Sequence, residues 1–588
     1  MESVPFLGVA ETRLGRRQAQ DDERGAGDSR RDNPGSDGER SMAGKRGTVI
    51  TALATTVALV SAAAPQSTAY TQGDSGSSDH TSAVVHTDTG AVRGALSAGH
   101  RIFQGIPYAG PPTGEHRWAS PRPVQPWRDV KDVTKPGPLC PQIPSQYGDI
   151  SSLEEDCLVL NVTTPARSAP GREAPVLVWI HGDGTIGGGE FFDARRLADR
   201  GLMVVTVNYR LGVFGGFAHD GLAGSGTFGL QDQQAALRWV ARNAAAFGGD
   251  PGHVTVAGSS FGATAIVGHL TSPTARGLFH GAVLSSGEGT MDMPAGMMGP
   301  QVPAYRWYTW RTLREMRDTG RDTAAALGCA NPDPARALSC LRALPVRRIL
   351  DVPYVMNAFQ AFAFGEGVLP ELPEKALRQG RFHRVPVLSG ATRDEHRLFV
   401  GLMWDAAGDR LGEEEYEGLV ATAFGEEHKA TVLAEYPVAD FPSPALAWAT
   451  LVTDRMWARG TYAQHTALGR HVPVYAYEFA DRDAPMYLPV RDGDFDFGAY
   501  HASDTPYVFE DEAARRLFTP AQARLADTIT DHWAAFAATG RPDRRGLAPW
   551  PRFVPGSGVP YTRSLAPAAV APVDYAAMHN LDFWHRLP

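Results

Sequence analysis

Six short runs, several of them continuously apolar and rich in valine, alternate along this chain with segments of helical periodicity. Continuous apolar strands of this kind are typical of parallel sheets that are covered on both faces. Between two of them, GLQDQQAALRWVARNAAAF places Leu230, Leu237 and Val240 on one face of a helix. The alternation predicts an α/β fold with a mostly parallel central sheet flanked by helices. The expected strands are PVLVWIH (175–181), MVVTVNY (203–209), HVTVAG (253–258), GAVLSSG (281–287), VPVLSG (385–390) and VPVYAYEFA (472–480).

Residues 84–588 contain no internal repeat and no long linker, so we expect them to form one domain. Residues 290–380 and 400–470 are irregular and rich in Pro and Met, which indicates helical insertions that wall a substrate gorge. The net charge of −9 is small for 588 residues, and both signs are interspersed. Without a basic stripe, no nucleic-acid partner is expected.

The N-terminal region has three predicted parts. Residues 1–41 are polar and charged, as in a disordered extension. Residues 42–69 have the basic start, the apolar stretch and the small-residue end of a secretory signal peptide, and residues 70–83 form a linker. The apolar stretch is short for a membrane span, so we expect secretion without stable membrane insertion; a single membrane anchor is the alternative. A signal in this place suggests that translation starts at Met42 and that cleavage follows Ala69.

The four cysteines agree with export. Four cysteines allow three pairings, and local closure favours Cys140–Cys157 and Cys329–Cys340. Each such loop is worth about 3 kcal/mol in a chain-entropy estimate. The alternative is four free buried thiols, which an oxidising compartment disfavours.

The segment VTVAGSSFGATA, residues 254–265, contains the candidate nucleophile. Gly258-Ser259-Ser260-Phe261-Gly262 matches G-x-S-x-G between a strand and a helix, where a sharp turn exposes the central hydroxyl. Very small residues are needed two positions before and after the nucleophile. Gly258 and Gly262 meet that need for Ser260, whereas Ser259 would have Phe261 there. Ser260 is therefore the expected nucleophile, although the same letters occur by chance in ordinary turns.

A serine hydroxyl needs a general base and an acid that orients it. Asp394 and Glu395 follow the strand VPVLSG, and catalytic groups gather beyond strand ends in open α/β sheets. His501 follows the last expected strand, in FGAYHASDTPYVF. Spacing alone does not choose Glu395 over Asp394, or His501 over His465.

From about Val84 to its end, the chain resembles the type-B carboxylesterases, the cholinesterase-like and para-nitrobenzyl esterase branch of the α/β-hydrolases. The motifs that carry the resemblance are FQGIPYAGPP with Arg117-Trp118, EDCLVLNV, VLVWIHG, NYRLGVFGGF, GLQDQQAALRWVARNAAAFGGDP, the Ser260 turn, VLSSG, GATRDE, YHASDTPYVF, and HWAAFAATGRPD with PWP. The resemblance implies an α/β-hydrolase fold and a serine esterase that acts on small-molecule carboxylic esters through an acyl-enzyme.

Carried over position by position, the family's acid falls on Glu395 and its histidine on His501. Its oxyanion hole falls on the backbone N–H groups of Asp183, Gly184 and Phe261. The family also pairs cysteines locally, in agreement with the pairings above. No H-E-x-x-H motif and no glycine fingerprint of a dinucleotide site occur, so neither a metal nor another cofactor is expected.

The chain departs from the family at Asp183, where a glycine is usual, and at Phe261, where alanine is usual. A carboxylate about 4 Å from the oxyanion would repel it by roughly 4 kcal/mol at an effective dielectric of 20. We therefore expect the Asp183 side chain to turn away into its own loop. The phenyl ring of Phe261 suggests a preference for short acyl groups. The alternative function is a catalytically weak or silent cholinesterase-like binding protein.

Overall fold

The computed structural model describes residues 83–97, 99–166, 173–307, 309–405, 410–488, 490 and 495–587. The expected disordered extension (1–41), the signal peptide (42–69) and all but the last residue of the linker (70–83) lie outside these ranges. Within the ranges, no helix combines the length and the apolar character that crossing a membrane requires.

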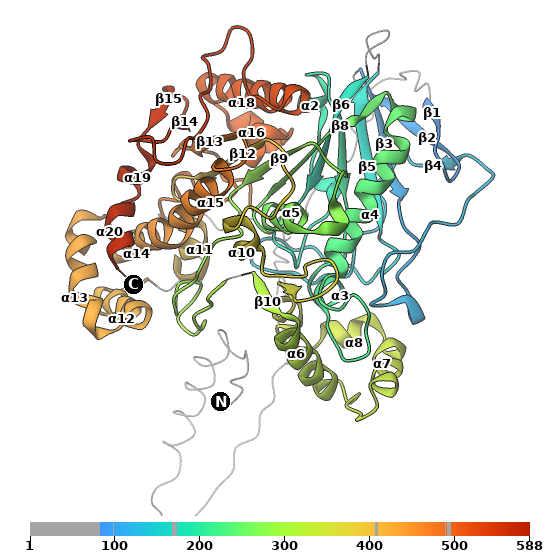
Figure 1. The fold of residues 1–588 in the computed structure, drawn as a ribbon, viewed down its shortest axis with the longest axis horizontal. Helices are drawn as coiled ribbons and strands as arrows, with labels where there is room; N and C mark the ends of the chain where they lie inside the picture. Colours follow the sequence, from blue (N-terminus) through green and yellow to red (C-terminus); the bar gives the residue numbers. More distant parts are fainter. Residues whose placement is uncertain are drawn as a thin grey trace, which may run out of the picture. The chain divides into compact units, whose positions relative to one another are not determined.

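One large sheet organises the described residues (Figure 1). Its strands follow the order β1-β2-β3-β5-β7-β6-β8-β9-β12-β13-β14-β15, and β4 pairs with β2. Pairing is parallel from β7 to β14 and antiparallel at both edges, so the sheet is mostly parallel in its centre, as expected. The bounds are β1 Ala83–His86, β2 Ala91–Ser97, β3 His100–Pro107, β4 Lys131–Asp132, β5 Val159–Pro165, β6 Ala174–Ile180, β7 Met203–Val207, β8 Gly249–Ser259, β9 Gly281–Ser285, β12 Val387–Thr392, β13 Val474–Phe479, β14 Thr562–Leu565 and β15 Val570–Val573.

The six short runs of the sequence are the contiguous strands β7, β6, β8, β9, β12 and β13, so the expected α/β architecture is confirmed. Alternate residues of these strands enter two different cores. Val176 and Val178 of β6 pack in the core that includes α4 (Phe228–Asn243) and α5 (Phe261–Thr271). Leu177 of β6 packs in the core of α18 (Pro520–Thr539). Helices therefore cover both faces of the sheet.

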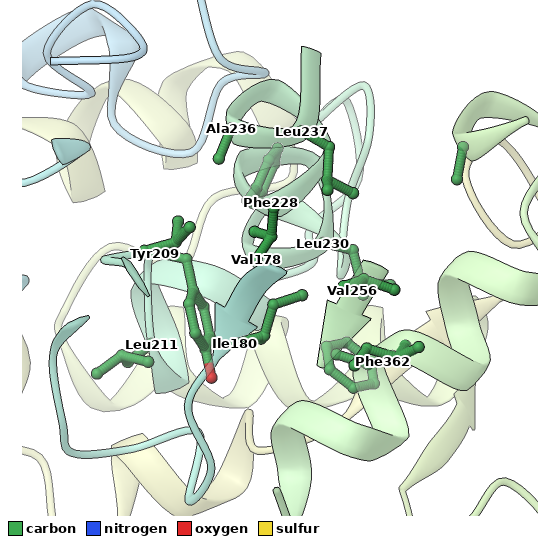
Figure 2. Close-up of a cluster of buried hydrophobic side chains, with 14 of the residues drawn as sticks. Val178, Ile180, Tyr209, Leu211, Phe228, Leu230, Ala236, Leu237, Val256 and Phe362 are labelled. Atoms are coloured by element: carbon green, nitrogen blue, oxygen red, sulfur yellow. The ribbon is translucent and has the colours of Figure 1, made fainter. Parts of the chain in front are cut away.

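The core under α4 is drawn in Figure 2. Val178 and Ile180 from β6 and Val256 from β8 lie beside Leu230 and Leu237 of α4, and each of these side chains is at most 1% exposed. Apolar burial of this kind stabilises the centre of the sheet by about 1.5–3 kcal/mol per large side chain. The strand ends that carry the functional residues are thereby held on a rigid base.

Two groups of helices interrupt the strand order, where the sequence indicated insertions. The first group lies between β9 and β12 and the second between β12 and β13 (Figure 1). The second group has an apolar core of its own, which includes Tyr416 and Trp448. That these insertions wall a gorge stays a prediction. Their helices are α6 Leu313–Ala326, α7 Pro334–Ala343, α8 Val346–Leu350, α9 Val355–Ala358 and α10 Pro373–Arg378, then α11 Arg397–Val400, α12 Glu413–Phe424, α13 Glu426–Glu435, α14 Pro444–Val452 and α15 Arg459–Gly469.

Both expected disulfides are present. Cys140 is bonded to Cys157 across 17 residues, and Cys329 is bonded to Cys340 across 11 residues. The alternative of four free thiols is therefore wrong.

Candidate active site

Ser260 lies at the sharp turn between β8 and α5. Its φ of 56° and ψ of −127° are strained for a residue with a side chain. The turn passes so close to β6 that a Cβ on Gly262 would lie 2.1 Å from the carbonyl oxygen of Ile180, and one on Gly258 would lie 2.8 Å from the same atom. Glycine at both positions is therefore a steric requirement of this turn. Ser259 is buried, and its Oγ has no hydrogen-bond partner among the described residues.

The imidazole of His501 joins Ser260 to Glu395. Nε2 of His501 is 2.9 Å from Ser260 Oγ, and Nδ1 is 2.5 Å from Glu395 Oε2. The second carboxylate oxygen of Glu395 accepts a 2.7 Å hydrogen bond from the N–H of Thr392. Because Glu395 accepts from Nδ1–H, the tautomer leaves Nε2 free to accept the proton of the Ser260 hydroxyl. The aromatic rings of Phe399 and Trp457 pack beside the imidazole at 5.2 and 4.9 Å.

The two competing candidates have other partners. Asp394 forms a bidentate pair with Arg482, at 2.5 and 2.9 Å, and accepts a hydrogen bond from the N–H of Ala499. It thereby anchors the loop that carries His501. His465 faces Ser389 Oγ at 3.0 Å, and burial lowers its pKa to about 3, so it stays neutral. Neither Asp394 nor His465 contacts Ser260.

Asp183 turns its side chain into its own loop, as expected. The carboxylate oxygen Oδ1 accepts hydrogen bonds from the N–H of Thr185 at 2.8 Å and of Ile186 at 3.1 Å, and a further one from the Thr185 hydroxyl. Burial raises the pKa of Asp183, while these hydrogen bonds and the nearby His501 lower it. The backbone of Asp183 has a φ of 63°, which Asp tolerates better than most residues do.

The three backbone N–H groups that are expected to form the oxyanion hole, those of Asp183, Gly184 and Phe261, differ in their hydrogen-bond partners. The N–H of Gly184 donates to the carbonyl of Gly182 at 2.9 Å. Those of Asp183 and Phe261 have no protein acceptor within the described residues. The N–H of Phe261 also opens helix α5, where the helix dipole favours negative charge. Two of the three expected oxyanion donors are therefore unoccupied.

Sequence reasoning missed two supports of this loop, because both come from the first helical insertion and carry no motif. The amide of Gln360 donates to the carbonyl of Asp183. The ring of Phe362 stacks on that of Phe261 with centroids 4.5 Å apart. Phe261 in turn lies against Gly184, where a Cβ would meet the ring at 2.6 Å.

Sequence reasoning also missed a second buried carboxyl group beside the triad-like chain. Asp504, in the HASD segment after His501, accepts a 2.6 Å hydrogen bond from the Ser285 hydroxyl at the end of β9. Burial raises its pKa to about 6. Its place three residues after His501 was visible in the sequence, but its contact with β9 was not.

A sheet of this order with a strand–serine–helix turn defines the α/β-hydrolase class. Solved structures agree: a thermophilic PNB esterase has a TM-score of 0.67 at 30% identity and covers 83% of this chain and 97% of its own. A second PNB esterase has a TM-score of 0.65 at the same identity and coverage.

Sequence comparison gives the family. The family model "Carboxylesterase family" matches residues 81–563. Para-nitrobenzyl esterase of Bacillus subtilis (strain 168) is 33% identical over 493 residues, which are 80% of this chain and 92% of the relative. Acylcarnitine hydrolase of Mus musculus is 32% identical over 80% of this chain and 85% of the relative. The chain belongs to the carboxylesterase family and is a carboxylic ester hydrolase.

Proposed function

We propose that this protein is a secreted serine esterase that cleaves small-molecule carboxylic esters through an acyl-enzyme. The observation that carries the proposal is the unbroken chain from Ser260 Oγ to His501 and on to Glu395, with separations of 2.9 and 2.5 Å. Two relatives have names that describe ester hydrolysis, para-nitrobenzyl esterase and acylcarnitine hydrolase. They support the substrate class.

In the proposed first step, His501 Nε2 takes the proton from Ser260 as its oxygen attacks the ester carbonyl. Glu395 keeps the imidazole in the required tautomer and stabilises the positive charge that forms on it. His501 then gives the proton to the leaving alcohol, and the acyl group stays on Ser260. A water molecule, deprotonated by the same imidazole, attacks the acyl-enzyme and releases the carboxylic acid.

The negative charge of each tetrahedral intermediate is assigned to backbone donors. The N–H groups of Asp183 and Phe261 are free to donate among the described residues, whereas that of Gly184 must first leave the carbonyl of Gly182 to complete the expected set. Loss of one such donor costs about 3–4 kcal/mol in related chemistry. The Asp183 carboxylate accepts hydrogen bonds from the N–H groups of Thr185 and Ile186 in its own loop.

The test is hydrolysis of p-nitrophenyl esters of increasing acyl length by the wild type, Ser260→Ala and Ser259→Ala. The first variant should lose nearly all turnover, while Ser259→Ala should keep it, because the Ser259 hydroxyl has no partner within the described residues. An organophosphonate should label Ser260, identified by peptide mass spectrometry. An unlabelled protein without turnover would instead support the silent binding function.

Secretion is part of the proposal and has its own test. Disulfide bonds persist in oxidising compartments, and two are present. Expression of the whole chain, followed by N-terminal sequencing of protein from the medium, should give a mature end after Ala69. A protein that stays in the cell with residues 42–69 attached would contradict secretion.

A further inference from the structure

Glu288 is a buried carboxyl group that the proposed mechanism does not use. It follows β9 by three residues, and the residue is 3% exposed. Its Oε1 accepts a 2.7 Å hydrogen bond from the hydroxyl of Thr461 on α15. Its Oε2 is buried and has no hydrogen-bond partner among the described residues. One of the two carboxyl oxygens therefore has an unsatisfied hydrogen-bonding capacity.

Glu288 belongs to a group of buried carboxyl side chains that includes Glu395 of the proposed active site and Asp504, which interacts by charge with both Glu395 and His501. Glu395, which follows β12, is close enough to interact with Glu288 by charge. The hydroxyl of Tyr575, on α19 (Tyr575–Met578), lies within the electrostatic reach of Glu288, Glu395 and Glu478 of β13. From α15, only the neutral Thr461 hydrogen-bonds to the carboxyl group of Glu288.

Three of the neighbouring carboxylates, Glu395, Asp454 and Glu478, have imidazole partners, whereas Glu288 does not. Glu395 faces His501 at 2.5 Å. Asp454 and Glu478 share His579, at 2.7 Å from each of its ring nitrogens. No salt bridge to Glu288 occurs in the part of the chain that the structure describes.

A buried carboxylate that lacks a cation and has one unsatisfied oxygen is strongly disfavoured relative to the protonated acid. Burial and then the negative charge of Glu395 raise the pKa of Glu288 to about 8, and the hydrogen bond from Thr461 opposes the shift. The group is therefore neutral at neutral pH and becomes charged in mildly alkaline solution.

We propose that Glu288 is a positioning residue whose charge acts through Glu395 on the imidazole of His501. This inference rests on the proposed function. When Glu288 is neutral, the imidazolium that forms as Ser260 loses its proton is balanced by Glu395 and, above about pH 6, by Asp504. When Glu288 is ionised, a further negative charge near Glu395 stabilises that imidazolium more. The kcat then rises. KM stays unchanged, because the extra negative charge stabilises the imidazolium of the transition state and not the bound substrate.

The test is the pH dependence of kcat for the wild type and Glu288→Gln, whose amide keeps the shape and the oxygen that accepts from Thr461. The wild type should show two rising steps, of which the upper lies around pH 8. Glu288→Gln should keep the lower step, lose the upper one, and have a plateau roughly tenfold below that of the wild type. Glu512→Gln, at an exposed position of α17 (Glu512–Leu517), is the matched control. Its pH profile should keep both steps of the wild type.

A second variant and a second measurement keep the test independent of how well Glu288→Gln folds. Thr461→Val removes the hydrogen bond that favours the charged form, so the upper step should move to higher pH. In a difference titration, the wild type should release one proton more than Glu288→Gln around pH 8. Wild-type hydrolysis with an unchanged two-step profile in Glu288→Gln, or equal proton release, would overturn this inference alone. Absence of wild-type hydrolysis would overturn the proposed function as well.

Discussion

The side chains of Asp394 and Glu395, neighbours in the chain, enter two separate hydrogen-bond networks. Asp394 pairs with Arg482 and holds the N–H of Ala499, while Glu395 holds the imidazole of His501. One carboxylate thus fixes the loop and the other faces the proposed base.

Glu395→Gln should therefore mainly lower activity, whereas Asp394→Asn should mainly lower stability. Glu395→Gln keeps the size of the side chain but disfavours the required tautomer, so kcat should fall by about 10³- to 10⁴-fold. Asp394→Asn removes the charge that pairs with the half-exposed Arg482 guanidinium, so it should lower the free energy of unfolding by about 1–3 kcal/mol and change kcat less. Steady-state kinetics and denaturant unfolding on both variants check this. Equal kcat losses would contradict the division of roles.

Asp183→Asn removes a charge without removing the acceptor oxygen for Thr185 and Ile186. Because the carboxylate adds unfavourable potential near the oxyanion, we expect kcat/KM to stay the same or to rise by up to about tenfold. Asp183→Gly should change kcat/KM in the same direction, because glycine adopts a φ of 63° without strain. A hundredfold loss in both variants would mean that the carboxylate assists the reaction.

Phe261→Ala should widen the range of acyl groups that the protein accepts. The ring lies against Gly184 and Phe362, next to the proposed nucleophile, and its loss leaves space there. We expect kcat/KM for long-chain p-nitrophenyl esters to rise relative to the acetate, while the acetate value changes little. The same chain-length profile in both proteins would show that the ring does not limit the acyl group.

Gly262→Ala should prevent correct formation of the Ser260 turn. The added Cβ would lie 2.1 Å from the Ile180 oxygen and 2.6 Å from that of His181, and these backbone atoms have little freedom to move. The variant should lose activity and several degrees of Tm. Gly268→Ala, on the same helix, is the control: its Cβ would have no neighbour nearer than 3.6 Å, and the helix should gain up to about 1 kcal/mol.

Loss of the His579 imidazole should destabilise the protein. Two buried carboxylates, Asp454 and Glu478, raise the pKa of His579 to about 10 from 6.5. The charged imidazole therefore contributes stability fully below about pH 6.5, and this contribution is lost as the pH rises through about 10. His579→Leu should cost about 3–5 kcal/mol near pH 6 in chemical denaturation. His585→Leu, at an exposed position of α20 (Leu581–Arg586), should cost less than about 0.5 kcal/mol.

The centre of the fold was predictable because its strands are buried on both faces. β6 is a continuous apolar run and the second half of β8 is buried throughout, and such segments have few alternatives to a covered parallel strand. The edge strands were not predicted. β1 and β4 are short and largely exposed, and β15 contains a proline, so their sequences lack a strand pattern.

Only part of the candidate site could be predicted from the local sequence. The glycines around Ser260 select it over Ser259, because steric crowding acts on neighbouring residues. His501 lies 241 residues from Ser260, and no local pattern favours it over His465. Only the family resemblance selected His501 and Glu395. Gln360 and Glu288 carry no motif, because their roles arise from contacts made by distant loops.

The separation of 241 residues between the serine and the histidine also has a consequence for biosynthesis. Strands β9 and β12 lie between β8 and β13 in the sheet, and long-range parallel pairing of this kind forms slowly. A growing polypeptide that has emerged only as far as Ser260 carries a serine without its proposed base. The proposed nucleophile and base can therefore meet only after most of the polypeptide has been made.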